Sequence, residues 1–254
     1  MKAIFSLIFT LLLSSLIFGQ HRTVHVFVAL CDNKYQGIVP VPASLGNGKD
    51  PARNLYWGAA YGVKTYFNGK TTDWELIKTI KSTDPAILER LLFKHSTLEV
   101  YMLADAYDGE KIKQCVGDFL KASNGQDALK INYSSSSLNF GGTSDLVAYV
   151  GHDGLMDFNI DIKYDKNTDE RKEAMILACY SKNYFGPEIR KAGAHPLLWT
   201  THLMAPEAYT LKSALDGWIR DESGAEIDER AAQVYHRYQK CGIKGARNLF
   251  TTEF

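Results

Sequence analysis

The sequence predicts an α/β fold in which helices cover both faces of a mostly parallel central sheet. Three observations lead to this prediction. Short segments that are apolar throughout recur along the chain, as expected for strands buried on both faces. Segments with the apolar spacing of amphipathic helices lie between them. The chain has 254 residues, which suits one large domain with a full hydrophobic core.

In the first half of the chain, residues 24–30 (VHVFVAL) and 98–104 (LEVYMLA) are the predicted strands. Residues 35–49 hold two prolines and several glycines, so we expect a loop there. Asp50-Pro51 is a typical helix start. The predicted helices of this half are residues 52–67, 74–81, 85–95 and 110–122.

In the second half, two further strands end at residues with reactive side chains. Residues 146–150 (LVAYV) end at Gly151-His152, and residues 174–178 (AMILA) end at Cys179. A charged surface excursion is expected between them at residues 159–173, and a polar loop before them at residues 134–142. The remaining predicted elements are a strand at residues 197–201 and helices at residues 186–192, 205–219 and 226–239.

The N-terminus has the pattern of a secretory signal peptide. Lys2 gives a short positive end, an apolar run follows, and Gly19 is a small residue near the expected cleavage point. A membrane anchor is the alternative reading, although the run is somewhat short to span a bilayer. We therefore expect residues 1–20 to be removed and residues 21–254 to form one domain, secreted or periplasmic and not bound to a membrane.

Composition narrows the class of partner. Lys plus Arg is 29 and Asp plus Glu is 29, so the formal net charge is zero. Nucleic acids and anionic membranes bind basic surfaces, so neither is expected as the main partner. The four widely spaced cysteines include no C-x-x-C pair, which argues against a structural zinc site. Cys31 and Cys115 are read as core residues or as members of a bridge, and Cys31 could also pair with Cys179.

The endings of the two central strands predict a reactive pair. If these strands are parallel neighbours, the imidazole of His152 and the thiol of Cys179 lie roughly 5–10 Å apart at one edge of the sheet. A thiolate is a nucleophile, and a nearby histidine helps to form it and protonates the leaving group. Backbone N–H groups near Gly151, Asp153 and Gly154 are candidates to stabilise an oxyanion.

These strand endings resemble those of the caspase-like cysteine peptidases, which include legumains, gingipains, clostripain and metacaspases. Members of that group carry His-Gly at the end of one strand and Ala-Cys at the end of the next. The matching segments here are residues 147–152 (VAYVGH) and 176–181 (ILACYS). A helix and a strand with hydroxyl residues at its end follow in the family, and residues 197–202 (LLWTTH) stand there.

The resemblance implies a caspase-like three-layer sandwich that acts as a cysteine endopeptidase on a peptide or protein, without a cofactor or metal. His152 is then the general base and Cys179 the nucleophile. The substrate pocket implied by the strand ends is formed by Cys31, Asp32, Thr200, Thr201, His202 and Glu207. Asp153 stands where family members have glycine, and the segment between His152 and Cys179 is short, which predicts a trimmed cleft.

Two other functions remain open at this stage. The same fold could serve as a catalytically inactive binding protein, which the Asp153 substitution and the short segment would fit. A metal-assisted hydrolase is the third possibility, with His152, Asp153, Asp157 and His202 as nitrogen and oxygen ligands. No H-x-x-x-H or H-E-x-x-H spacing supports it.

Overall fold

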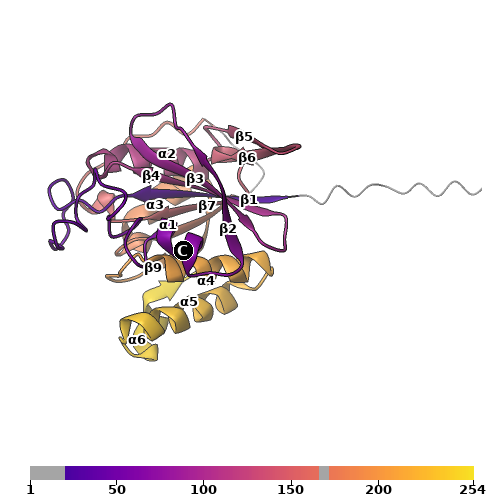
Figure 1. Cartoon of the computed structure of the whole chain (residues 1–254). Coiled ribbons are helices and arrows are strands. Elements are labelled where there is room, and N and C mark those ends of the chain that lie inside the picture. The colour runs from indigo at the N-terminus through magenta and orange to yellow at the C-terminus, as the bar shows by residue number, and fades with distance from the viewer. Residues whose placement is uncertain (1–20, 166–171) are drawn as a thin grey trace, which may run out of the picture.

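Eight strands form one central sheet in the order β10-β9-β8-β7-β1-β4-β3-β2 (Figure 1). The structure is a computed structural model that describes residues 21–165 and 172–254. The strands of the sheet are β1 (Arg22–Ala29), β2 (Trp74–Ile80), β3 (Ile87–His95), β4 (Val100–Tyr107), β7 (Leu146–Val150), β8 (Glu173–Leu177), β9 (His195–Thr200) and β10 (Phe250–Thr251). A separate hairpin consists of β5 (Leu129–Tyr133) and β6 (Ser136–Phe140).

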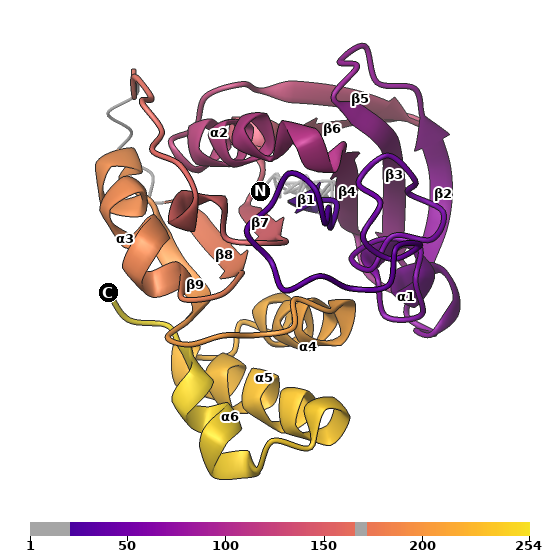
Figure 2. The same cartoon turned by 90° about the vertical axis from the view of Figure 1, so that its left-hand side faces the viewer.

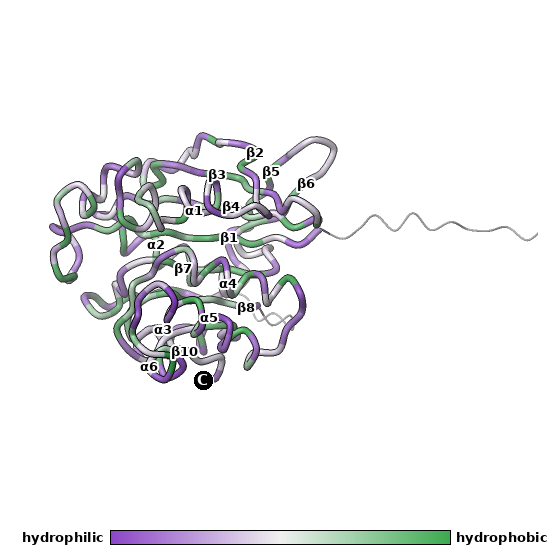
Figure 3. Tube along the Cα trace, turned by 60° about the horizontal axis from the view of Figure 1, so that its bottom comes forward, coloured by the Kyte–Doolittle hydropathy of each residue, from purple (hydrophilic) through white to green (hydrophobic). Residues whose placement is uncertain are grey.

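The central part of the sheet is parallel. Strand β1 pairs in parallel with β4 on one side and β7 on the other, and β7, β8 and β9 continue in the same direction. Strands β2, β3 and β10 are antiparallel to their neighbours at the two edges. The trace through the central strands is largely hydrophobic (Figure 3), as is usual for parallel strands that are covered on both faces. The predicted α/β class with a mostly parallel sheet is confirmed.

Alternating side chains of the central strands enter two separate cores. Val24, Val26 and Val28 of β1 pack in a core with residues of α1, α4 and α5. Phe27 and Ala29 of the same strand pack in a second core with α2 and α3. Helices therefore cover both faces of the sheet. Their bounds are α1 (Val63–Gly69), α2 (Ile112–Ser123), α3 (Ser181–Ala192), α4 (Ala208–Ile219), α5 (Gly224–Gln239) and α6 (Ile243–Leu249).

Loops gather where the parallel strands end. Figure 2 faces this edge, and the long loop that follows β1 crosses in front of the sheet. The loop contains the turns predicted at residues 35–49. Ligands of open α/β sheets bind at this edge, so it is the place where site residues are expected.

Two predicted helices are wrong, because residues 74–81 and 85–95 form the antiparallel hairpin of β2 and β3. The spacing of Ile87 and Leu91 fits a helix face, but Leu91 and Phe93 pack in one core while Leu92 packs in another. Pairing with β4, rather than local periodicity, decides the conformation of this segment. The bulge between Ile87 and Glu89 further obscures the strand pattern.

Other boundaries differ from the prediction in ways that have local causes. Residues 51–62 form turns instead of helix, and α1 is correspondingly short. The expected polar loop at residues 134–142 includes β6, because the preceding strand β5 pairs with it. Helix α3 begins five residues earlier than predicted, directly after β8. The predicted signal peptide at residues 1–20 lies outside the described residues, as do residues 166–171 of the predicted excursion.

The structure includes one buried ionic network within the sheet. Asp105 was expected at the end of its strand, but it lies inside β4 and is fully buried. Arg90 donates two hydrogen bonds of 2.6 Å to its carboxylate, and the Nε2 atom of His25 lies 3.0 Å away. No helix among the described residues has the length and apolarity needed to cross a membrane.

Candidate active site

The register of β7 and β8 brings the strand ends that lead to His152 and Cys179 next to each other. Val150 pairs with Leu177, and the N–H of Gly151 donates to the carbonyl oxygen of Leu177 over 3.3 Å. His152 and Cys179 each follow their strand's paired residue by two positions. Neighbouring strands lie about 4.8 Å apart, so both residues emerge at the same edge of the sheet. The predicted adjacency and parallel direction of these strands are confirmed.

Cys179 occupies a sharp turn between a strand and a helix. Tyr180, the next residue, has the left-handed backbone angles φ 50° and ψ 29°, and α3 begins at Ser181. The Ser181 hydroxyl donates to the carbonyl oxygen of Ile176 over 2.9 Å, which ties the helix start back to β8. The N–H of Tyr180 donates to the carbonyl oxygen of His202. The turn thus holds a partly exposed thiol at the N-terminus of a helix.

The thiol of Cys179 is bound to a backbone segment that the sequence did not reveal. Its Sγ atom donates to the carbonyl oxygen of Met204 at 3.5 Å and accepts from the Met204 N–H at 3.4 Å. Burial raises the pKa of Cys179, and the nearby charge of Asp153 adds to this effect. The resting thiol is therefore neutral, and it would need a base to take its proton before it could act as a nucleophile.

The imidazole of His152 is buried and is held through Nε2, while the backbone of His152 is held separately. Its Nε2 atom lies 2.7 Å from Oδ2 of Asp157, and the same oxygen accepts the N–H of Gly37 at 2.8 Å. The Tyr149 hydroxyl donates to the His152 carbonyl oxygen at 2.7 Å. The sequence had suggested Asp157 only as a possible metal ligand. The turn signal at residues 153–154 could have indicated that this carboxylate returns to His152.

The three backbone candidates for an oxyanion site differ in availability. The N–H of Gly151 is occupied by the sheet hydrogen bond to Leu177. Neither Asp153 nor Gly154 donates its N–H to an acceptor in the described part of the chain. These two amides lie directly after His152, so they can donate to an oxygen that develops negative charge near Cys179.

Asp153 turns its side chain inward, away from the solvent. It is fully buried, and its Oδ1 accepts the N–H of Leu155 at 3.0 Å, which starts a short 3₁₀ turn. Its other oxygen, Oδ2, has no hydrogen-bond partner among the described residues. Burial, with a further contribution from the charge of Asp157, raises the pKa of Asp153 to about 7. Asp153 thus shapes the turn after His152.

The residues predicted after β1 build the loop that frames the site. Cys31 is fully buried, its backbone is bound by the Asn54 amide, and burial raises its pKa to about 11. Asp32 is also buried, and its carboxylate accepts the N–H groups of Lys34, Tyr35 and Gly48. Cys31 through its backbone and Asp32 through its carboxylate therefore organise the loop.

The residues predicted after β9 are placed at different depths. Thr200 is fully buried, and its hydroxyl donates to the Ala178 carbonyl oxygen. Thr200 therefore stabilises the turn at Cys179 from the interior of the protein. The Thr201 hydroxyl donates to Asn248 of α6 at 2.6 Å. His202 is exposed, with its ring 5.9 Å from that of Tyr180. Glu207 accepts from Tyr209 and Gln239, and burial raises the pKa of Glu207.

Two tyrosines near the thiol were not identified as site residues. Tyr56 is almost fully buried and lies close to the thiols of both Cys31 and Cys179. The hydroxyl oxygen of Tyr235 accepts the N–H of Ala205 at 3.0 Å, next to the Met204 segment. Tyr56 lies in a segment that also holds Trp57 and Tyr61, and no local pattern distinguishes it from these aromatic neighbours.

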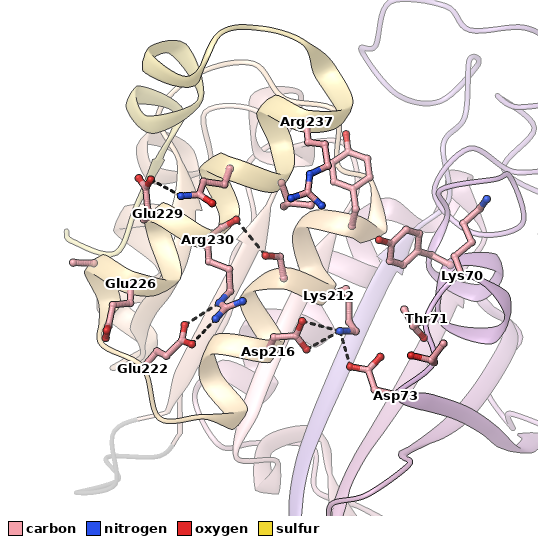
Figure 4. Close-up of a pocket in the computed structure, with 17 residues that line it drawn as sticks. Lys70, Thr71, Asp73, Lys212, Asp216, Glu222, Glu226, Glu229, Arg230 and Arg237 are labelled. Atoms are coloured by element: carbon pink, nitrogen blue, oxygen red, sulfur yellow. Dashed lines mark hydrogen bonds and ion pairs between the residues drawn. The ribbon is translucent and has the colours of Figure 1, made fainter.

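A groove between α1, α4 and α5 lies apart from these residues (Figure 4). Its volume is about 900 Å³, and none of the predicted site residues lines it. Lys212 is held there by Asp73 and Asp216 at 2.7 Å. Arg230 is held by Glu222. Several charges of this groove are thus neutralised by one another, and no cysteine or histidine lines it.

All four cysteines are free, so neither the bridge considered for Cys31 and Cys115 nor a pairing of Cys31 with Cys179 is present. Within residues 21–165 and 172–254, no three His, Cys, Asp or Glu side chains gather as a metal-binding group. Comparisons with protein family models, with curated proteins and with solved structures found no match.

Proposed function

We propose that the protein is a secreted cysteine endopeptidase with a caspase-like α/β fold, in which Cys179 is the nucleophile and His152 the general base. The register of β7 and β8 carries this proposal, because it puts a thiol and an imidazole at adjacent strand ends. The apolar pattern of residues 1–20 supports export.

The order of elements around the site supports the family resemblance. A strand that leads to His152 is followed in the sheet by a strand that leads to Cys179. Helix α3 and strand β9 come next, and β9 ends at Thr200. The caspase-like peptidases have this succession, with the hydroxyl residues near the substrate pocket. Here Thr201 and His202, rather than the buried Thr200, reach the surface.

The geometry suits a general-base mechanism. His152 takes the thiol proton as Sγ of Cys179 bonds to the peptide carbonyl carbon. The amides of Asp153 and Gly154 donate to the carbonyl oxygen as it becomes negative. The protonated imidazole then gives its proton to the leaving amine, and an acyl-enzyme remains. Water hydrolyses this thioester, with His152 again as the base, and the thiol is restored.

Exposed apolar side chains around the site support a peptide substrate. Val39, in the loop that also holds Gly37, is 87% exposed, and Leu203, next to Met204, is 66% exposed. Met156 is also exposed, one residue before Asp157. These side chains are free to pack against apolar side chains of a bound peptide, which would bury their exposed surface. An extended peptide could contact both loops while its carbonyl group meets Cys179.

The test is cleavage of an internally quenched peptide library by the purified protein. We expect turnover that Cys179→Ala abolishes, that His152→Gln lowers about 10²-fold or more, and that a chelator leaves unchanged. Cys241→Ala, which removes an exposed thiol, is the matched control and should retain full activity. Cleavage that survives Cys179→Ala, or that the chelator removes, would refute the proposal and favour contamination or a metal-assisted hydrolase.

A catalytically inactive binding protein is the second candidate. The hydrogen bonds between Cys179 and Met204, together with the raised pKa of that thiol, favour it. The two candidates differ in their response to a peptidyl chloromethyl ketone, which requires a thiol and a base that act together. Covalent capture at Cys179 that depends on His152 supports the peptidase. Reversible peptide binding without capture supports the binding protein.

A further inference from the structure

One carboxylate oxygen connects two loops of the site. Oδ2 of Asp157 accepts a hydrogen bond from Nε2 of His152 and another from the N–H of Gly37. An ionised carboxylate can only accept hydrogen bonds, so the neutral imidazole must carry its proton on Nε2. Nδ1 of His152 is then left with a free lone pair, and it has no hydrogen-bond partner in the described part of the chain.

The chain around Asp157 is built to keep this carboxylate in place. The Met156 N–H donates to the Asp153 carbonyl oxygen at 3.1 Å, and the Asp157 N–H donates to that of Gly154 at 3.0 Å. This single turn brings Asp157 back to His152, five residues earlier in the chain. Gly37, in the loop after β1, packs tightly against the same carboxylate. A Cβ atom added at Gly37 would lie only 2.4 Å from Oδ1 of Asp157, so no larger residue fits there without moving Asp157.

We propose that Asp157 is a positioning residue, which fixes His152 in the Nε2–H form and thereby makes Nδ1 the atom that exchanges protons with Cys179. The inference rests on the proposed peptidase function and adds a third member to its Cys–His pair. The Asp157 carboxylate holds the buried ring on one side. The Tyr149 hydroxyl holds the backbone carbonyl oxygen of His152. The orientation of the imidazole thus does not depend on the substrate.

The proton balance of each step follows from this assignment. As the bond between Sγ and the carbonyl carbon forms, the S–H proton moves to Nδ1 and the ring becomes an imidazolium. The proton on Nε2 stays in its hydrogen bond, and the negative charge of Asp157 stabilises the cation. When the C–N bond breaks, the proton on Nδ1 passes to the leaving amine. Water then attacks the thioester, gives one proton to Nδ1, and that proton returns to the sulfur.

A spectroscopic experiment tests the hydrogen bond independently of activity. In protein with ¹⁵N-labelled histidine, the hydrogen-bonded proton on Nε2 should exchange slowly with solvent and give a separate downfield resonance. The loss of this resonance in His152→Gln assigns it to His152. We expect this resonance to disappear in Asp157→Ala and to persist in Asp161→Ala, which removes an exposed carboxylate four residues further on. A resonance that correlates with Nδ1, or one that survives in Asp157→Ala, overturns the inference.

Kinetics then separate positioning from a merely structural role. We expect Asp157→Ala to lower kcat about 10²-fold with little change in KM, and Asp157→Asn, which keeps an acceptor but no charge, to lower it about tenfold. Gly37→Ala should act like Asp157→Ala because its new methyl group displaces the carboxylate. Its matched control is Gly69→Ala, where a Cβ atom meets nothing within 4 Å.

The outcomes distinguish this inference from the proposed function. Full kcat in Asp157→Ala, despite loss of the resonance, overturns the positioning role. If the unmodified protein cleaves no peptide but shows the Asp157-dependent Nε2–H resonance, the peptidase proposal fails while the fixed orientation of His152 stands.

Discussion

The hydroxyl groups of Ser181 and Thr200 lie 3.2 Å apart, where β8 gives way to α3. The backbone N–H of Thr200 also donates to the Ser181 hydroxyl at 2.9 Å, and the Thr200 hydroxyl donates to the carbonyl oxygen of Ala178. Both side chains are fully buried. Ala178, directly before Cys179, and Ser181, the first residue of α3, are thus both bound to the end of β9, which restricts the position of the thiol.

Thr200→Val should therefore destabilise the protein and loosen the turn at Cys179. Valine has nearly the same shape but leaves buried partners of the hydroxyl without hydrogen bonds, which costs about 1–3 kcal/mol. Chemical denaturation measures this loss, and peptide turnover should fall with it. Thr79→Val, at an exposed position of β2, is the matched control and should change stability by less than about 0.5 kcal/mol. Equal stability of the two variants would contradict the supporting role.

The four thiols should react with iodoacetamide in an order set by exposure. Cys241 is exposed and should be alkylated first. Cys179 should follow, because it is only partly buried but burial raises its pKa and keeps the thiolate scarce. Cys31 and Cys115 are buried and should react only on unfolding. Mass spectrometry of the labelled peptides gives the order. Labelling of Cys179 before Cys241 would mean that the resting thiol is already ionised, which would contradict the pKa that burial raises.

Elements that are apolar throughout could be predicted from the sequence, because their pattern depends on burial alone. The segment that forms β7 was predicted with its observed bounds, and β8 within one residue. The hairpin of β2 and β3 could not be predicted in this way. Its apolar residues fit a helix as well as a strand, and its conformation depends on pairing with β4, which lies outside any local window.

At the candidate site, side-chain groups could be predicted from the sequence, whereas backbone groups could not. His152 and Cys179 could be found because imidazole and thiol are reactive side-chain types and each follows an apolar strand. Met204 and Gly37 contribute only backbone N–H and C=O groups, which every residue type except proline possesses in full. Residue identity therefore gave no sign of them. The depth of Thr200 also depends on how β9 packs against α3, which sequence spacing does not specify.

Asp153→Asn should stabilise the protein at high pH and not at low pH. Burial raises the pKa of Asp153 to about 7, so the folded state binds this proton more tightly than the unfolded state does. The native protein therefore loses stability as the pH rises from about 4 to about 7. Asparagine removes that penalty, although its buried NH₂ group costs part of the gain. We expect Asp153→Asn to raise the free energy of unfolding by about 2 kcal/mol at pH 8 and to leave it without a gain at pH 4. Denaturation curves measure both values, with Asp161→Asn as the control.

Asp105→Asn should have the opposite effect. Burial alone would raise the pKa of Asp105, but hydrogen bonds from Arg90 and His25 outweigh it and lower the pKa. The ionised carboxylate thus stabilises the fold at neutral pH, and this contribution disappears as the pH falls through the lowered pKa. Asparagine leaves the buried guanidinium of Arg90 without a counter-charge, so we expect a loss of about 3–5 kcal/mol at pH 7. The difference in the free energy of unfolding between Asp105→Asn and the unmodified protein should shrink below about pH 4. A loss that stays constant from pH 7 to pH 3 would show that shape, rather than charge, makes Asp105 important.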